Sequence, residues 1–171
     1  MMLDANTICS LFDSLNEELG AIGVIGEVGI CGGAVMCLVF NVRQSTKDVD
    51  AIFEPTAAIR EAATRVAIKE GVPKDWLNDA AKGYFLSHPP TVDVINLSNL
   101  RVWAPSPDYM LAMKCISARF DTHDAGDVRF LIKHLGLKNP EDVFRVINAY
   151  YPKRVVPART QFFIEEILGT D

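Results

Sequence analysis

The sequence lacks the marks of a membrane-spanning, exported or zinc-bound protein. No apolar run approaches the ~20 residues that a membrane span needs, and the run Val35–Phe40 is far shorter. The first six residues contain no basic segment, so no secretory signal is expected. The four cysteines include no C-x-x-C pair. That absence argues against a metal site of this kind and predicts buried, reduced thiols in the cytoplasm.

Positive charge is also scarce. The 17 basic residues are outnumbered by 22 acidic ones, which gives a net charge of −5. Proteins that coat nucleic acid regardless of its sequence are usually basic overall, so that class is disfavoured. With 171 residues, 49% of them hydrophobic, the chain is long enough to bury a core without disulfides or a structural metal.

The hydrophobic spacing changes character along the chain. The first hundred residues alternate between helical and strand patterns, and the last sixty are almost entirely helical. Strands are expected over 28–31, 49–53, 84–86, 91–95 and 100–103, and helices over 5–19, 34–40, 57–70, 72–81, 108–120, 124–135, 139–151 and 157–168. This order predicts an α+β fold. We expect a small mixed sheet flanked by helices over residues 1–105, and a helical C-terminal part over residues 106–171 packed on that core.

Three acidic residues in or beside strands are the first candidates for chemistry. Asp48 and Asp50 flank Val49 at the start of a strand, and alternate residues of a strand point to the same side. Two carboxylates this close repel each other unless a cation lies between them, and Mg²⁺ or Mn²⁺ suits such oxygen ligands. Asp93 lies in a second apolar strand, so three carboxylates converge if the two strands are neighbours. The alternatives are a solvated turn for the first two acids and an exposed edge strand for Asp93.

A glycine pair precedes these acids. Gly32 and Gly33 separate a strand from a short helix, where backbone N–H groups can approach an anionic ligand. The hydroxyls of Ser45 and Thr46 could donate to a phosphate, and Arg43 could neutralise it. A ligand-free turn and ordinary loop charges are the alternatives. Phosphate at the glycines and metal at the carboxylates together predict a site for a nucleoside triphosphate.

The order of these residues resembles the nucleotidyltransferase signature of the polymerase-beta-like superfamily. That signature is a Gly-Gly or Gly-Ser turn followed by Asp-x-Asp, and here fourteen residues separate Gly33 from Asp48. The second glycine stands where many members have serine. Asp93 matches the superfamily's third acid by its strand context. The resemblance implies that the three acids hold two divalent ions beside an NTP, whose phosphates lie against the glycine pair and Thr46.

The C-terminal half resembles minimal members of that superfamily, among them the AbiEii-type toxins of bacterial toxin–antitoxin systems. The matching residues are Lys114, Ala118-Arg119 and the run His123–Asp127, in place of Lys, Ala-x-Arg and Asp-x-x-Asp. The resemblance implies that Lys114 approaches the nucleotide phosphates and that Asp124 or Asp127 belongs to the active site. From the residues alone, Lys114 could instead extend along an amphipathic helix, and Asp124 could be a helix cap.

The predicted function is that of a metal-dependent nucleotidyltransferase, which moves an NMP from an NTP to an acceptor hydroxyl and releases pyrophosphate. The acceptor stays open between an RNA end such as that of tRNA, a protein, and a small molecule such as an aminoglycoside. The resemblance alone implies a toxin–antitoxin or phage-defence role with a cognate antitoxin or toxin as partner. The alternative is a catalytically inactive module of the same fold that acts as an antitoxin or in partner recognition. A third option is a helical interaction protein whose function lies in the C-terminal half. It is suggested by the aromatic residues Phe144, Tyr150, Tyr151, Phe162 and Phe163, which at helical spacing could equally be core residues.

Overall fold

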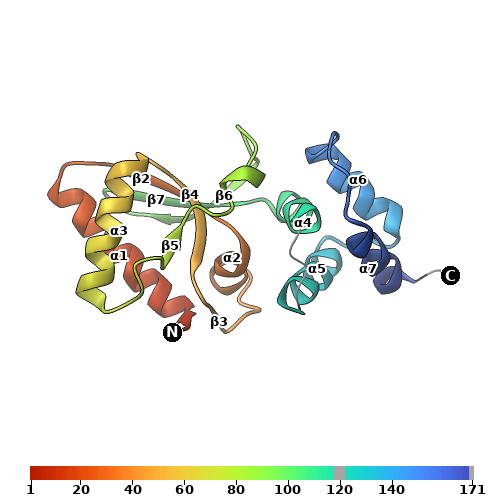
Figure 1. Cartoon of the computed structure of the whole chain (residues 1–171), viewed down its shortest axis with the longest axis horizontal. Helices are drawn as coiled ribbons and strands as arrows, with labels where there is room; N and C mark the ends of the chain where they lie inside the picture. The colour runs from red at the N-terminus through yellow and green to blue at the C-terminus, as the bar shows by residue number, and fades with distance from the viewer. Residues whose placement is uncertain (118–121, 170–171) are drawn as a thin grey trace. The chain divides into compact units, whose positions relative to one another are not determined.

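The computed structural model describes residues 1–117 and 122–169, without the side chains of residues 122 and 123. The fold is α+β, with 52% helix and 18% strand, so the predicted fold class is confirmed. The chain forms two compact units (Figure 1). The first unit comprises Met1–Phe85 with Thr91–Pro105, and the second comprises Leu86–Pro90 with Ser106–Asp171.

A five-stranded mixed sheet forms the centre of the first unit. Its strand order is β5-β4-β2-β7-β6. The strands are β2 (Gly26–Ile30), β4 (Val49–Glu54), β5 (Leu77–Asn78), β6 (Thr91–Asn96) and β7 (Leu100–Pro105). β2 pairs with β4 in antiparallel fashion and with β7 in parallel fashion; β5 runs parallel to β4, and β6 runs antiparallel to β7. Two short strands, β1 (Leu3–Asp4) and β3 (Ser45–Thr46), pair separately.

The helices α1 (Ala5–Ala21) and α3 (Thr56–Glu70) cover one face of this sheet (Figure 1). Asp4 caps the start of α1 by accepting a hydrogen bond from the Thr7 N–H, and Gly71 ends α3 in the left-handed conformation. A Cβ at Gly26 in β2 would lie 2.9 Å from a methyl carbon of Leu19 and 3.0 Å from one of Ile59. The even-numbered residues of β2 therefore face the two helices.

The opposite face of the sheet follows from the strand registers. Gly29 in β2 is opposite both Ile52 in β4 and Trp103 in β7, and Trp103 is opposite Asp93 in β6. Residues in register across a sheet share a face, and so do alternate residues of one strand. Asp50, two residues before Ile52, therefore lies on this second face.

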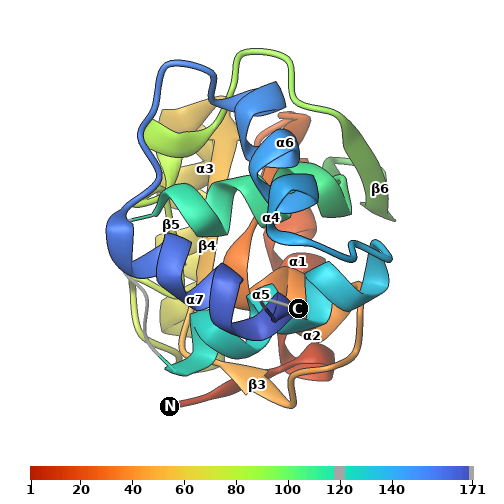
Figure 2. The same ribbon diagram turned by 90° about the vertical axis from the view of Figure 1, so that its right-hand side faces the viewer.

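The second unit is helical (Figure 2). It contains α4 (Pro107–Ile116), α5 (Thr122–His134), α6 (Pro140–Tyr150) and α7 (Ala158–Leu168). Helix α4 contacts both α5 and α6, and α6 also contacts α7. Asn139 caps α6 by accepting a hydrogen bond from the Asp142 N–H, and Pro140 occupies its first turn, as the sequence predicts.

The C-terminal aromatic residues do not form one shared surface. Tyr151 is buried and stacks on the buried Tyr109 in α4, and Tyr150 packs against the same ring. Phe163 lies beneath the Arg129 guanidinium at 5.1 Å, whereas Phe162 is exposed. Tyr151 is therefore a core residue, as aromatic residues at helical spacing often are, whereas Phe162 is exposed to solvent.

Two of the expected elements are wrong. The segment 72–81 was expected to be helical but contains β5, and the strand expected over 84–86 is replaced by a 3₁₀ helix over Lys82–Tyr84. Trp76 is the physical reason for the first difference, because it is buried and donates its indole N–H to the Ala63 carbonyl at 3.0 Å. The Trp76 carbonyl accepts from the Val49 N–H at 2.7 Å, so the segment extends along β4. The helix expected over 108–120 begins at Pro107 and ends earlier than expected, at Ile116, because Ser117 leaves the helical conformation (ψ 133°). Positions 118–120 lie outside the described residues.

Cys31, Cys37 and Cys115 are buried as predicted, whereas Cys9 is exposed. In the parts of the chain that the structure describes, no helix is long and apolar enough to cross a membrane.

The packing of α3 predicts different outcomes for its two isoleucines. Ile59 is fully buried against β2, and Ile68 on the same helix is 70% exposed. Ile59→Ala should lower the free energy of unfolding by about 2–5 kcal/mol, and Ile68→Ala should change it by less than about 0.5 kcal/mol. Urea unfolding of the two variants measures this, and equal losses would contradict the packing described for α3.

The Tyr150 phenol predicts a loss of stability at alkaline pH. Burial and its hydrogen bond to the Asp108 carboxylate raise the pKa of Tyr150 to about 12. A raised pKa favours the neutral phenol in the folded state, so this stabilisation is complete below about pH 10 and disappears as the pH rises towards 12. The difference in unfolding free energy between the wild type and Tyr150→Phe should therefore shrink between pH 9 and pH 11. A difference that stays constant over this range would refute the assignment.

Candidate functional site

The glycine pair lies directly beside one of the predicted acids. Residue Cys31 follows β2, and its N–H donates to the Asp50 carbonyl at 2.9 Å, which extends the pairing of β2 with β4. The next residue, Gly32, has φ +61°, a left-handed conformation that favours glycine. A Cβ at Gly32 would lie 3.6 Å from Oδ2 of Asp50. Gly32 and Gly33 are the first two residues of the short helix α2 (Gly32–Leu38), which was expected to begin only after them, at Ala34. The start of this helix and the Asp50 carboxylate are neighbours. We call Gly32, Gly33, Arg43, Thr46, Asp48 and Asp50 the glycine corner.

Gly33 has two polar side chains against it. A Cβ at this position would lie 2.5 Å from Nη1 of Arg43 and 2.5 Å from Oγ1 of Thr46. Both distances are shorter than real contacts allow, so a side chain at position 33 would displace these groups. This crowding gives a physical reason for glycine where many proteins with the Gly-Ser signature have serine. It also puts a guanidinium and a hydroxyl beside the glycine backbone.

Asp48 and Asp50 emerge at the start of β4 on either side of a buried residue. Val49 is fully buried and both acids are partly exposed, so the predicted alternation is confirmed. The Thr46 hydroxyl donates to the Asp48 carbonyl at 3.1 Å, which links the short strand β3 to β4. Asp50, on the face opposite to Val49, therefore projects away from α1 and α3, and Asp48 lies in the bend that precedes β4. Ser45 lies on β3 opposite Asp4.

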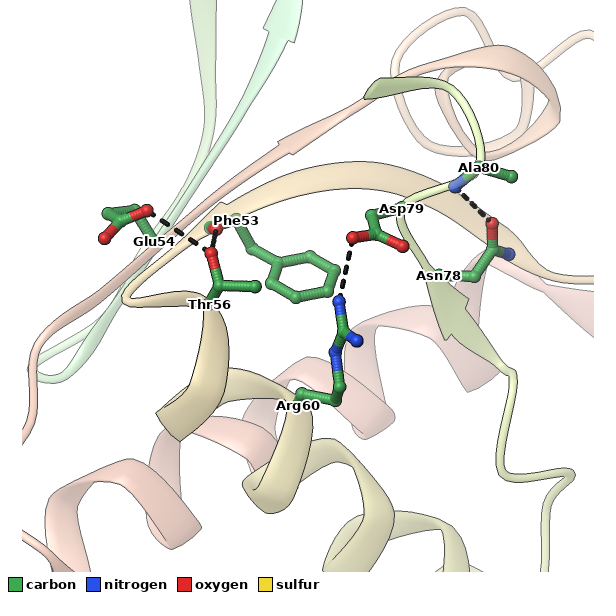
Figure 3. A network of polar contacts seen from close by, with 7 residues as sticks. All are labelled: Phe53, Glu54, Thr56, Arg60, Asn78, Asp79 and Ala80. Carbon is green, nitrogen blue, oxygen red and sulfur yellow. Dashed lines mark hydrogen bonds and ion pairs between the residues drawn. The ribbon is translucent and has the colours of Figure 1, made fainter. Parts of the chain in front are cut away.

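Asn78 is a polar residue near Asp50 that was not among the candidates from the sequence. It lies on β5 in register with Asp50 on β4, so the two residues share a face. Its Oδ1 accepts a hydrogen bond from the Ala80 N–H at 3.1 Å, and the next residue, Asp79, pairs with Arg60 at 2.8 Å (Figure 3). These contacts hold the turn after β5. Asn78 was missed because its segment was predicted to be helical.

Asp93 corrects the sequence-based account. The strands β2 and β7 lie between β4 and β6, so the expectation that the two acid-bearing strands are neighbours is wrong. Adjacent strands are about 4.8 Å apart, so three spacings put about 14 Å between β4 and β6. Asp93 is exposed on the edge strand, where a bulge lies between it and Ile95. Water can therefore solvate the carboxylate of Asp93. Asp93 and Asp50 are too far apart to bind the same metal ion.

Lys114 forms a second polar group, within the second unit. Its Nζ lies 2.7 Å from Oδ2 of Asp127 and 3.3 Å from Oδ1 of Asp124. The side chains of Lys114 and Asp127 are 9% and 8% exposed, whereas that of Asp124 is 25% exposed. Burial raises the pKa of the neighbouring Cys115 thiol to about 12. Ala118 and Arg119 lie outside the described residues.

The glycine corner has the donor set of a magnesium–phosphate site. Within residues 1–117 and 122–169, no group of three His, Cys, Asp or Glu side chains comes together as an all-protein metal site. Mg²⁺ needs no such group, because it is commonly held by one or two carboxylates together with substrate phosphates and water. The carboxylates of Asp48 and Asp50 fit this requirement, and Arg43 and Thr46 suit phosphate oxygens.

Comparisons with protein-family models, with curated proteins and with solved structures find no match to this chain. The candidate site therefore rests on the positions and chemistry of its own residues, without support from a relative.

The burial of Lys114 predicts that its removal is destabilising. Lys114→Met would leave two neighbouring carboxylates without their cation and should cost about 3–5 kcal/mol, the usual cost of breaking a buried ion pair. Arg145→Met on α6 is a suitable control, because the Arg145–Asp142 pair has a guanidinium that is 77% exposed. That change should cost less than about 1 kcal/mol. Thermal or urea unfolding measures both, and equal effects would contradict a structural role for the Lys114 cluster.

Proposed function

We propose that the protein is a metal-dependent nucleotidyltransferase, which moves an NMP from an NTP to an acceptor hydroxyl. The observation that carries this proposal is the glycine corner: a carboxylate lies beside Gly32, and a guanidinium and a hydroxyl lie beside Gly33. The resemblance to the Gly-Gly…Asp-x-Asp signature supports the same activity.

The charges of the corner suit a triphosphate bound together with a cation. Two carboxylates repel a bare triphosphate, so an anionic ligand gains from this site when a divalent ion accompanies it. The guanidinium of Arg43 can donate to phosphate oxygens with two N–H groups. The Thr46 hydroxyl has a single proton, which it donates to the Asp48 carbonyl, so it would have to rotate away from that carbonyl to donate to a phosphate. The space that a side chain at Gly33 would fill is occupied by Nη1 of Arg43 and Oγ1 of Thr46, so a phosphate bound beside Gly33 would meet these two groups.

Asp48 and Asp50 would hold Mg²⁺ or Mn²⁺ in this proposal. When bound, the ion supplies neutralisation of phosphate charge and an oriented contact to the triphosphate. The chain itself supplies position: Arg43 and Thr46 fix the phosphates against the Gly33 backbone. We include Lys114 and either Asp124 or Asp127 on the resemblance alone. Asp93 is left out of the metal-binding group.

The biological setting of the reaction is part of the same proposal. Acceptors of three classes fit a transferred NMP: an RNA end such as that of tRNA, a protein hydroxyl and a small-molecule hydroxyl. The resemblance supports a cytoplasmic toxin–antitoxin or phage-defence module with a cognate antitoxin or toxin as partner.

One observation favours a second candidate function. Asp93 lies about three strand spacings from Asp50, so at most two of the three acids that the resemblance implies remain for a shared metal site. A nucleotide-binding module without catalysis, acting as an antitoxin or in partner recognition, needs no third acid. Binding of Mg-NTP without any transfer would identify this function.

The acids of the sheet predict which variants lose activity. Protein, Mg²⁺ and each α-labelled NTP are incubated with total RNA, with total protein or with aminoglycosides, and the transferred label is measured. The double variant Asp48→Asn, Asp50→Asn should lose about 10²–10³-fold in rate, because it removes the carboxylates that would hold the divalent ion, and that ion would stabilise the negative charge developing on the phosphate. Asp93→Asn removes one carboxylate from the same sheet face and is the matched control, with transfer within about twofold of the wild type.

Two results would count against the proposal, and one would restore Asp93 to the metal-binding group. Transfer by the double variant at the wild-type rate excludes the glycine corner as the catalytic site. If Asp93→Asn folds but no longer transfers label, Asp93 belongs to the metal-binding group together with Asp48 and Asp50. An absence of label transfer with every NTP and acceptor, together with an absence of Mg-NTP binding by calorimetry, removes both candidate functions.

A further inference from the structure

The sheet face that carries Asp50 also carries an aromatic side chain that the proposed function does not use. Trp103 in β7 is in register with Gly29 in β2, and its indole extends across that glycine. A Cβ at Gly29 would lie 2.2 Å from Cζ2 and 2.3 Å from Cη2 of the Trp103 ring. The glycine therefore lets the indole lie close to the backbone of the neighbouring strand.

The position of the indole along the sheet relates it to the glycine corner. Gly29 is opposite Ile52 in β4, and Asp50 precedes Ile52 by two residues. Two residues of a strand span about 6.8 Å, and neighbouring strands lie about 4.8 Å apart. The backbone beneath the indole is thus about 8 Å from that of Asp50, on the same face. In a nucleotide, the ribose separates the base from the phosphates by a comparable length.

The ring itself is held in place and partly accessible. Phe85 contacts Trp103 edge to face, with ring centroids 6.0 Å apart and an interplanar angle of 82°. Both residues are partly exposed, whereas the other tryptophan, Trp76, is 1% exposed. An indole oriented by a neighbouring ring loses little conformational freedom when a ligand stacks on it.

We propose that Trp103 is the stacking surface for the nucleobase of the NTP, with Phe85 as the residue that positions its ring. This inference rests on the proposed function, because it takes the triphosphate to lie at the glycine corner. Stacking on an aromatic ring accepts every base, since each base has a π-face. The substrate class is therefore a nucleoside triphosphate, and this contact gives little selectivity between bases. A triphosphate without a base cannot make the stacking contact.

The test compares ligands with and without a base on the full chain. Calorimetry measures the dissociation constants of a Mg²⁺-bound non-hydrolysable ATP analogue and of Mg-tripolyphosphate. Tryptophan emission is recorded in the same titrations. In the wild type, the ATP analogue should quench emission and tripolyphosphate should not, because Trp76 is buried. Trp103→Leu should weaken analogue binding by about tenfold or more and leave tripolyphosphate binding within twofold. Trp103→Phe keeps an aromatic ring and should retain most of the analogue affinity.

The outcomes separate this inference from the proposed function. If Trp103→Leu binds both ligands as the wild type does, the stacking role is wrong and the glycine corner stands. If Trp103→Leu weakens both ligands equally, Trp103 has a structural role and the inference is also wrong. If the wild type binds neither ligand, the proposed function fails and the stacking role fails with it. Should Trp103→Leu not fold by circular dichroism, the wild-type quenching comparison and Trp103→Phe still decide.

Discussion

The antiparallel pairing of β2 with β4 is the constraint on which the candidate site depends. This ladder continues one residue beyond β2, where the Cys31 N–H donates to the Asp50 carbonyl. It therefore fixes the Gly32-Gly33 pair at the start of α2 against the start of β4, where the two carboxylates emerge. A slip of one residue in this register would turn Asp50 towards α1 and α3 and Ala51 away from them. The buried Val49 and Ala51 oppose such a slip, because they fill the core between the sheet and the helices.

Gly29, Gly32 and Gly33 share a physical role: each leaves space for a side chain from another part of the chain. At Gly29 the room is taken by the Trp103 indole, at Gly32 the Asp50 carboxylate is adjacent, and at Gly33 Arg43 and Thr46 approach. Glycine in a strand weakens it because backbone entropy is lost without any side-chain packing in return. The use of glycine at these positions is consistent with a backbone that a ligand or a side chain must approach closely. The same segment thus organises both the phosphate end and the base end of the proposed nucleotide site.

The sequence was informative where local patterns decide the structure and failed where distant pairing does. The alternation of Asp48, Val49 and Asp50, the Asn139 cap and the Gly71 helix end follow from neighbouring residues, and each was predicted correctly. Strand order is different, because it depends on which distant segments pair. The position of β7 between β2 and β6 left Asp93 at the sheet edge, and no local signal distinguishes that order from the one expected. Similarly, the burial of Trp76 places the strand β5 where the hydrophobic spacing predicts a helix. Asn78 was therefore not identified as a residue on the same face as Asp50. Gly29 could have pointed to Trp103, since an isolated glycine in a strand often marks close approach of another group.

The most direct test of the central claim is the location of the metal and the triphosphate. Crystals grown with Mn²⁺ and a non-hydrolysable NTP would give an anomalous difference map, which identifies the ion without a model of the ligand. We predict an Mn²⁺ peak in contact with the carboxylates of Asp48 and Asp50, with phosphate density against the Gly33 backbone and the side chains of Arg43 and Thr46. Nucleotide and metal bound at full occupancy elsewhere, with no ion at these two carboxylates, would contradict the account.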